Sequence, residues 1–220
     1  IEKRLADEIG PVVGNTHTET NFTGTAMTLA CHRAHDIIKN HCNADSRNVI
    51  INAGFGMTAA VNKFQRILGL KIPEQFRNCI DLNVKCRPVV FVTHMEHHSN
   101  QTSWLETIAE VVVIPPNNAG LVDFNILEEK LKEYADRQFK IGAFTAASNV
   151  TGIQTPVSEM AKLMHQHDGL CFVDYAAAAP YVEIDMHPHD SQAQLDAVFF
   201  SPHKFLGGPG SSGVLIFNSE

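Results

Sequence analysis

The sequence contains no apolar run near the roughly 20 residues that a membrane-spanning helix needs. Its first ten residues, Ile1–Gly10, are charged and lack an apolar core, so they do not predict a signal peptide. Positive charge is also scarce, because 17 Lys and Arg stand against 24 Asp and Glu, a net charge of −7. Nucleic acids and anionic membranes attract clustered Lys and Arg, so neither is expected as a partner.

Cysteine pairs of the Cys-x-x-Cys kind are absent as well. The five cysteines are scattered along the chain, at Cys31, Cys42, Cys79, Cys86 and Cys171. An odd, scattered set predicts reduced thiols in a cytoplasmic protein. Cys171 falls inside an apolar run and is expected to be a small buried side chain. No basic neighbours mark any of the others as catalytic.

Short apolar runs alternate with amphipathic stretches along the 220 residues, of which 44% are hydrophobic. Most runs are nearly continuous, as in Val89–Val92, which is typical of strands buried on both faces of a parallel sheet. The seven expected strands are Asn48–Ala53, Pro88–Thr93, Glu110–Pro115, Lys140–Ala146, Leu170–Asp174, Ala197–Ser201 and Gly213–Phe217. The glycine-rich loop before the last one is too short for a crossover helix, so this strand is expected to run antiparallel.

Four helices are expected between the strands, at Thr25–His41, Met57–Leu68, Phe124–Tyr134 and Pro156–His167. Asp123 is a good N-cap for the third helix, and Thr155 followed by Pro156 predicts the start of the fourth. The alternation predicts a single α/β domain over residues 1–220. Its expected architecture is a three-layer α/β/α arrangement with a mostly parallel seven-stranded sheet.

Ligands of such sheets bind beyond the carboxyl ends of the strands, so the residues after each strand are the candidates. The first strand is followed by Gly54-Phe55-Gly56-Met57-Thr58, which offers backbone N–H groups, a helix N-terminus and a hydroxyl. These groups predict a seat for an anion, although a plain tight turn into a helix has the same pattern. The Gly-Lys-Ser/Thr of a nucleotide-binding P-loop is absent.

Three histidines, His94, His97 and His98, follow the second strand. Their number raises the possibility of a zinc site. Their spacing differs from His-Glu-x-x-His, however, and no other segment supplies an obvious further ligand. The alternative is a flat ring that lies over the plane of a cofactor. We therefore expect no metal.

Three later strands also end in polar residues. Ser148-Asn149-Val150-Thr151-Gly152 can donate hydrogen bonds to a ligand. Asp174 closes an apolar strand, where a carboxylate needs a partner or a cleft, and it can also cap residues 175–179. Lys204 stands between an apolar strand and a glycine-rich loop. This is a poor place for a surface charge and a good one for a partly desolvated, nucleophilic amine.

In this order, the residues resemble the class V aminotransferase family of fold type I enzymes, which use pyridoxal 5'-phosphate (PLP). The resemblance is strongest to its cysteine desulfurase and selenocysteine lyase branch, and it runs from about Asn15 to the end of the chain. Its most specific element is Ser201-Pro202-His203-Lys204 followed by Gly208-Pro209-Gly210. Glu96-His97-His98-Ser99-Asn100 and Ser148-Asn149-Val150-x-Gly152 come next.

The resemblance implies a role for each candidate. Lys204 would hold PLP as a Schiff base, Asp174 would pair with the pyridine nitrogen, and His97 would stack on the ring. These three are the expected catalytic residues. The other expected cofactor ligands are Gly56, Met57, Thr58, Ser201 and His203 near the phosphate, and Asn149 on the phenolate side.

The resemblance further implies a small amino acid as substrate, with sulfur transfer from cysteine to give alanine. A homodimer and a sulfur-acceptor protein are the implied partners. One position departs from the family, because its Asp-x-x-Gln reads Asp174-Tyr175-Ala176-Ala177 here. The small C-terminal domain, with the substrate-carboxylate arginine and the persulfide cysteine, is expected beyond residue 220. A transaminase, an epimerase, a kynureninase-like lyase and a non-catalytic domain of this fold remain as alternatives.

Overall fold

The computed structural model of the protein describes residues 1–80, 83–208 and 210–219. Within these residues one seven-stranded sheet has the order β1-β7-β6-β5-β4-β2-β3. The strands are β1 (Asn48–Ala53), β2 (Val89–Thr93), β3 (Glu110–Ile114), β4 (Lys140–Thr145), β5 (Leu170–Asp174), β6 (Ala197–Phe200) and β7 (Gly213–Asn218). From β3 through β6 neighbouring strands are parallel, whereas β7 is antiparallel to both β6 and β1. The expected strands, the mostly parallel sheet and the antiparallel last strand are confirmed.

The central strands are buried on both faces, as their continuous apolar runs predict. In β2, Val89 and Phe91 belong to one hydrophobic cluster, and Val90 and Val92 belong to the other. Successive side chains of a strand point to opposite faces, so these two clusters are the two sides of the sheet. Burying each such side chain contributes roughly 1.5–3 kcal/mol.

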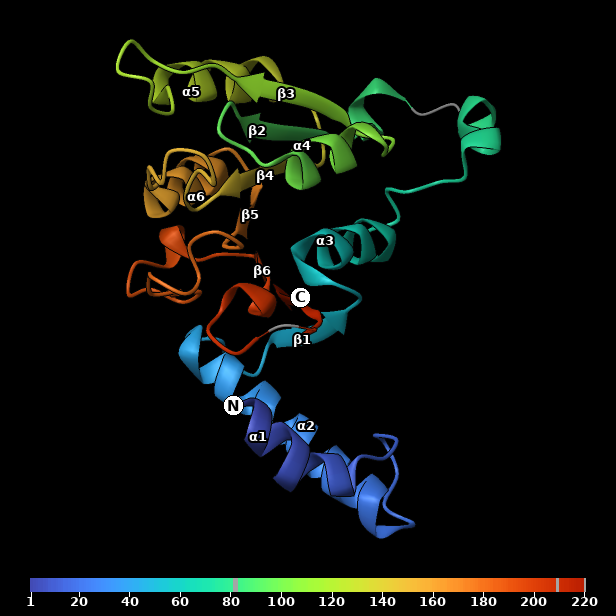
Figure 1. Ribbon diagram of the computed structural model, residues 1–220. Coiled ribbons are helices and arrows are strands. Elements are labelled where there is room, and N and C mark those ends of the chain that lie inside the picture. The colour runs from blue at the N-terminus through green and yellow to red at the C-terminus, as the bar shows by residue number, and fades with distance from the viewer. Residues whose placement is uncertain (81–82, 209, 220) are drawn as a thin grey trace.

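Helices cover both faces (Figure 1). They are α2 (Phe22–His41), α3 (Gly56–Ile67), α4 (His98–Leu105), α5 (Phe124–Glu133) and α6 (Val157–Gln166). Leu127 of α5 and Met160 of α6 pack in the cluster of Val89 and Phe91. Phe64 of α3 and Trp104 of α4 pack in the opposite cluster. The expected three-layer α/β/α architecture is therefore confirmed.

The helix caps predicted from the sequence are confirmed for α5 and wrong for α6. Asp123 caps α5 as expected, because its Oδ1 accepts from the N–H of Asn125 (3.0 Å) and of Ile126 (3.2 Å). The expected cap of α6 is wrong. This helix begins at Val157, and the hydroxyl of Thr155 donates instead to a backbone carbonyl of β4. The helix α4 was not expected at all.

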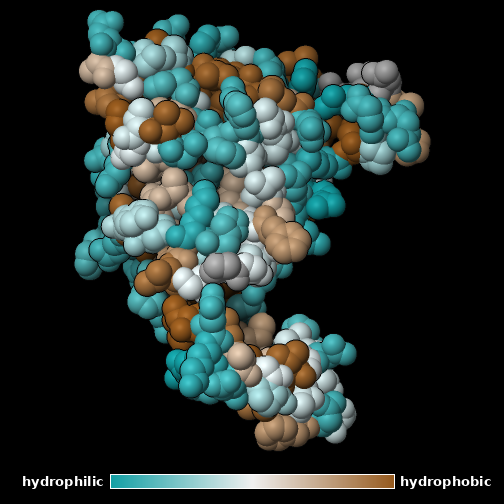
Figure 2. All heavy atoms as spheres, in the orientation of Figure 1, coloured by the Kyte–Doolittle hydropathy of each residue, from teal (hydrophilic) through white to brown (hydrophobic). Residues whose placement is uncertain are grey.

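Short helical segments complete the chain. They are α1 (Glu2–Arg4), η1 (Leu5–Ile9), η2 (Gly10–Val12), η3 (Glu74–Cys79), η4 (Val84–Cys86), η5 (Ser191–Ala193) and η6 (Pro202–Lys204). The N-terminal segments and much of α2 form an arm that extends from the body of the sheet (Figure 1). Figure 2 shows apolar residues on the surface of this arm as well as on the body. Among the described residues, no helix combines the length and the apolar character needed to cross a membrane.

Candidate functional site

All nine residues expected at the cofactor site line one cavity of about 240 Å³ at the carboxyl ends of the strands. They are Gly56, Met57, Thr58, His97, Asn149, Asp174, Ser201, His203 and Lys204. The lining is completed by Phe55, Ser99, Thr145, Ala147, Ala176 and Ala177. These residues follow five different strands, so the sheet topology is what brings them together.

The N-terminus of α3 and the end of β6 meet on one wall of the cavity. The buried N–H of Met57 donates to Oγ of Ser201 at 2.8 Å. Gly56 has a φ of +67°, and a Cβ there would lie 2.5 Å from Cε1 of His203. The left-handed φ and the close approach together favour glycine at this position. With Thr58 on the same turn, this wall offers the positive end of a helix and hydroxyl donors to an anion.

Asp174 closes β5 and is 4% exposed. Its Oδ1 accepts from the N–H of Ala176 at 2.8 Å, so it does cap the following segment. Burial raises the pKa of Asp174 to about 6, while the Ala176 N–H and the positive charge of Lys204 act to lower it. Within the described residues Oδ2 makes no hydrogen bond, so this oxygen is available to a group in the cavity.

Lys204 lies in the turn η6, three residues beyond Ser201, the buried residue that follows β6. Its side chain is exposed, so the expectation of partial desolvation is wrong for this chain. The cause is the turn η6, which carries Lys204 away from the buried strand while it still lines the cavity. Lys204 nevertheless lines the same cavity as Asp174 and His97, and its charge lowers the pKa of both.

His97 is the N-cap of α4 and lines the cavity. Burial, the charge of Lys204 and the neighbouring His98 lower the pKa of His97. His94 has a different environment, since its Nε2 lies 3.1 Å from the carbonyl oxygen of Gly120. Over the described part of the chain, no three His, Cys, Asp or Glu side chains are grouped to hold a metal ion.

Glu96, the buried residue directly before His97, belongs to the motif quoted from the sequence but was given no role there. Oε1 of Glu96 accepts from the hydroxyl of Thr93 (2.7 Å) and from the N–H of Thr145 (2.9 Å), and Oε2 accepts from Asn100 (2.8 Å). Burial raises the pKa of Glu96 to about 7, and these donors act to lower it. Glu96 thereby ties the turn that carries His97 to β4. Its position directly before His97, after an apolar strand, was the available signal.

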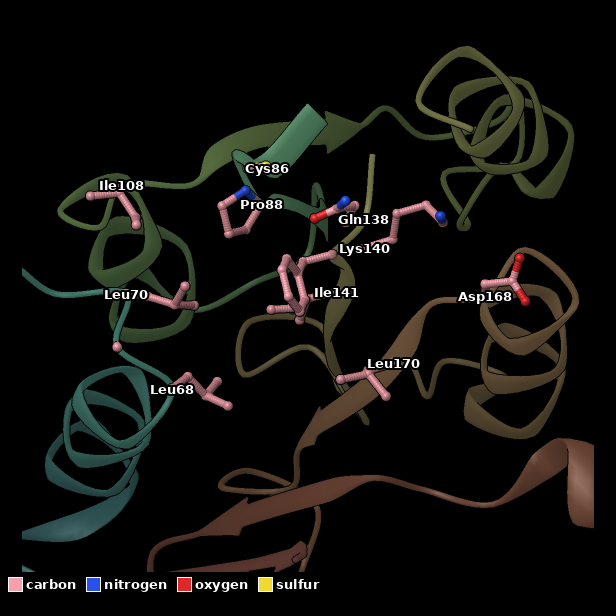
Figure 3. A pocket seen from close by; sticks show the side chains of 12 residues that line it. Leu68, Leu70, Cys86, Pro88, Ile108, Gln138, Lys140, Ile141, Asp168 and Leu170 are labelled. Carbon is pink, nitrogen blue, oxygen red and sulfur yellow. The ribbon is translucent and has the colours of Figure 1, made fainter. Parts of the chain in front are cut away.

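A larger cavity, of about 490 Å³, lies at the opposite edge of the sheet. Figure 3 shows it among the apolar side chains of Leu70, Ile141 and Leu170, with Lys140 and Asp168 to one side. It is lined by residues at the amino ends of β2, β4 and β5, and none of the nine expected residues reaches it. The carboxyl-end cavity is therefore the candidate active site.

The donor set of that cavity fits PLP. The N-terminus of α3 and Ser201 suit a phosphate, and Asp174 suits a protonated ring nitrogen. His97 supplies a flat ring, and Lys204 supplies a primary amine that can condense with an aldehyde. The turn at Gly56 leaves room for a phosphate, and the buried carboxylate of Asp174 can pair with a ring nitrogen in the same cavity.

Comparison with known proteins agrees with this chemistry. A family model described as Aminotransferase class-V matches residues 3–220. A probable cysteine desulfurase from Halalkalibacterium halodurans is 30% identical over 205 residues, which cover 91% of this chain and 45% of the relative. The chain spans about half the length of the relatives and solved structures that it matches.

Solved structures share the fold. A NifS-like protein from Rickettsia africae superposes with a TM-score of 0.76 at 20% identity, covering 100% of this chain and 55% of that one. A cysteine desulfurase from Escherichia coli has a TM-score of 0.67 at 26% identity, covering 93% of this chain and 47% of that one. The chain therefore belongs to the class V aminotransferase family, a family of PLP-dependent enzymes.

Proposed function

We propose that this chain is the cofactor-binding large domain of a cysteine desulfurase or selenocysteine lyase, which removes sulfur or selenium from an amino acid and leaves alanine. The observation that carries the proposal is that Lys204, Asp174 and His97 line the same cavity beside the N-terminus of α3. When bound, PLP supplies an aldehyde for the substrate amine and a ring that accepts electrons. The relatives named as cysteine desulfurases support the choice of substrate.

Each side chain has one task in this proposal. Lys204 would hold the cofactor through a Schiff base to its primary amine and would give it up to the amine of the substrate. The carboxylate of Asp174, ionised above its pKa of about 6, keeps a proton on the ring nitrogen through a charge-assisted hydrogen bond. His97 covers the ring face. Met57 and Ser201, together with Gly56, Thr58 and His203, hold the phosphate, and Asn149 faces the phenolate side.

The cysteines of this chain do not supply the nucleophile that a desulfurase active site needs. None of the five lines the part of the cavity that the structure describes. Burial raises the pKa of Cys42 to about 12 and raises that of Cys171 well above its ordinary value, so neither is a nucleophile near neutral pH. We therefore propose that the persulfide-carrying cysteine and the substrate-carboxylate arginine belong to sequence outside residues 1–220.

A second candidate follows from Ala177. The methyl group of this residue lines the cavity at the position where the family resemblance leads one to expect a glutamine. Without that amide the phenolate side of the cofactor has one donor fewer. This departure favours another reaction of the class V family, such as transamination, epimerisation or a kynureninase-like cleavage, as the alternative to desulfuration.

The proposal extends to assembly and location. Phe55 at the cavity and Val150 beside Asn149 are 82% and 84% exposed, which is unusual for large apolar side chains next to an active site. We propose that a second copy of the chain covers them in a homodimer and that a separate protein accepts the sulfur. The free cysteines, with no disulfide among them, support a cytoplasmic location.

The test is product analysis with the full-length protein and PLP. Incubation with cysteine should release alanine and leave persulfide sulfur on the protein, which an added thiol reductant converts to sulfide, and Lys204→Ala should give neither alanine nor sulfide. Selenocysteine in place of cysteine would separate the two members of the proposed branch. Formation of a keto acid without alanine would favour transamination and would overturn the desulfurase assignment.

A further inference from the structure

Ser99 holds one nitrogen of the His97 ring with two hydrogen bonds. The backbone N–H of Ser99 lies 3.2 Å from Nδ1 of His97. The Ser99 hydroxyl lies 2.6 Å from the same nitrogen. Both residues line the candidate active site, so this arrangement belongs to the site and not to the distant surface.

The first of these bonds identifies the proton of the ring. A backbone N–H can only donate, so Nδ1 must be the acceptor and carries no hydrogen. A neutral imidazole then carries its hydrogen on Nε2. The hydroxyl of Ser99, facing the same bare nitrogen, donates to it as well. Within the described residues Nε2 makes no hydrogen bond, so its N–H is free for a ligand.

The charges around His97 oppose a second proton. His97 is the N-cap of α4, where the positive end of the helix disfavours a cation. Lys204, from the turn after β6, and His98, the next residue along α4, both act to lower the pKa of His97. Protonation of Nδ1 would also break the bond from the backbone N–H of Ser99, and it would reverse the bond with the Ser99 hydroxyl. Burial, Lys204 and His98 thus all lower the pKa of His97 and favour the neutral ring.

We propose that Ser99 is a positioning residue that holds His97 as the neutral Nε2–H tautomer, so that the ring donates a hydrogen bond to an acceptor on the bound amino acid or cofactor. A general base needs a bare nitrogen that faces its target, and the bare nitrogen of His97 faces Ser99. His97 is therefore a donor and a ring cover, not the base of the reaction. The inference rests on the proposed function only for the identity of the ligand.

The test compares Ser99→Ala and Ser99→Thr with the unsubstituted full-length protein before PLP is added. Exchange of the ring C2–H, followed by mass spectrometry, gives the pKa of His97. Ring nitrogen NMR, assigned with His97→Gln, gives its tautomer. Ser99→Ala keeps the backbone N–H bond and removes the hydroxyl, so the Nε2–H tautomer should become less populated and the pKa of His97 should shift by less than about one unit. Ser99→Thr keeps the hydroxyl and should restore both values.

Ser158→Ala is the matched control, since Ser158 is also the second residue of its helix, α6, and is exposed. It should leave His97 unchanged. A hydrogen on Nδ1 in the unsubstituted protein, or an unchanged His97 in Ser99→Ala, would overturn the inference. Visible absorbance after PLP addition is recorded separately. If the protein fails to bind PLP, the proposed function is wrong, but the measured tautomer of His97 still tests the role of Ser99.

Discussion

The backbone N–H of Met57 donates a 2.8 Å hydrogen bond to Oγ of Ser201, across 144 residues of sequence. This bond joins the first turn of α3 to the residue that follows β6. Because the oxygen of Ser201 is occupied as an acceptor, its hydroxyl hydrogen remains free to donate to an anion in the cavity. The proposed phosphate seat thus has a donor whose direction is set by the fold.

Ser201→Ala removes that donor and leaves the buried N–H of Met57 without its acceptor. We expect the affinity for PLP to fall about tenfold, which corresponds to the loss of one hydrogen bond to a charged group. Absorbance titration with PLP measures this, and the exposed Ser158→Ala serves as the control. Equal affinities in the two variants would show that Ser201 does not face the phosphate.

Gly56→Ala tests the close approach between α3 and His203. Both Gly56 and Gly120 have left-handed backbone angles, with φ of +67° and +77°, so alanine costs about 1–2 kcal/mol of backbone strain at either position. A Cβ at Gly56 would also collide with His203, whereas nothing lies within 4 Å at Gly120. Thermal unfolding should therefore show a larger loss in Gly56→Ala than in Gly120→Ala, and PLP affinity should fall only in the former. Equal losses of thermal stability and of PLP affinity in the two variants would contradict the close approach of Gly56 to His203.

Asp174→Asn separates function from stability. Burial raises the pKa of Asp174 from 3.8 to about 6, so the folded chain retains a proton there that the unfolded chain has released. Stability from this group is therefore present at low pH and is lost as the pH rises through that interval. In protein without added PLP, Asn should raise the free energy of unfolding at about pH 8 by on the order of 2–3 kcal/mol, with the gain fading toward pH 4.

The same variant should retain PLP and lose most of its turnover, because an amide does not hold the proton on the ring nitrogen as a carboxylate does. Denaturant unfolding at several pH values and single-turnover kinetics provide the two measurements. Asp45→Asn is a control of opposite sign, since Arg47 lowers the pKa of the exposed Asp45 to about 2. Unchanged turnover in Asp174→Asn would leave Asp174 as the cap of Ala176 and nothing more.

Ala177→Gln places an amide on the cavity wall. If Asn149 faces the phenolate side of the cofactor, a second donor there should stabilise the phenolate and weaken its hold on the proton of the Lys204 Schiff base. The visible absorbance should then change with pH at a lower midpoint than in the unsubstituted protein. Ala176→Gln is unsuitable as a control because Ala176 is buried, so Ala177→Leu, similar in size and without a donor, serves instead. Identical midpoints in the Gln and Leu variants would contradict this placement of Ala177.

The strands and nine cavity residues could be predicted because their signals are local. A continuous run such as Val89–Val92 needs only its own residues to be recognised, and a polar residue after such a run marks the carboxyl end of a strand. The topology of a parallel sheet then collects those ends at one edge. Asp174 and Lys204 were located in this way from positions 30 residues apart in sequence.

What could not be predicted depends on partners far along the chain. Glu96 supports the turn that carries His97 because the N–H of Thr145, 49 residues later, donates to it. The hydroxyl of Thr155 binds a carbonyl of β4 instead of capping α6, so a tertiary contact replaced a local one. The short helix α4 has few apolar residues beyond Trp104 and Leu105, too few for a periodic pattern.

The exposure of Lys204 could not be predicted either. It depends on the turn η6, and the flanking sequence does not show how far this turn carries Lys204 from the buried strand. Of the glycine-rich motif that follows, Pro209 lies outside the described residues. The assignment of Lys204 as the nucleophile therefore depends on its primary amine and on its place in the cavity, not on burial of its side chain.

Borohydride reduction of the full-length protein with bound PLP, followed by peptide mass spectrometry, tests the central claim most directly. A Schiff base is fixed by reduction as a stable secondary amine on the lysine that formed it. The account predicts loss of the visible band near 400 nm (an approximate position for such a Schiff base) and a pyridoxyl adduct on the peptide that contains Lys204. An adduct on any other lysine, or no covalent adduct at all, would contradict it.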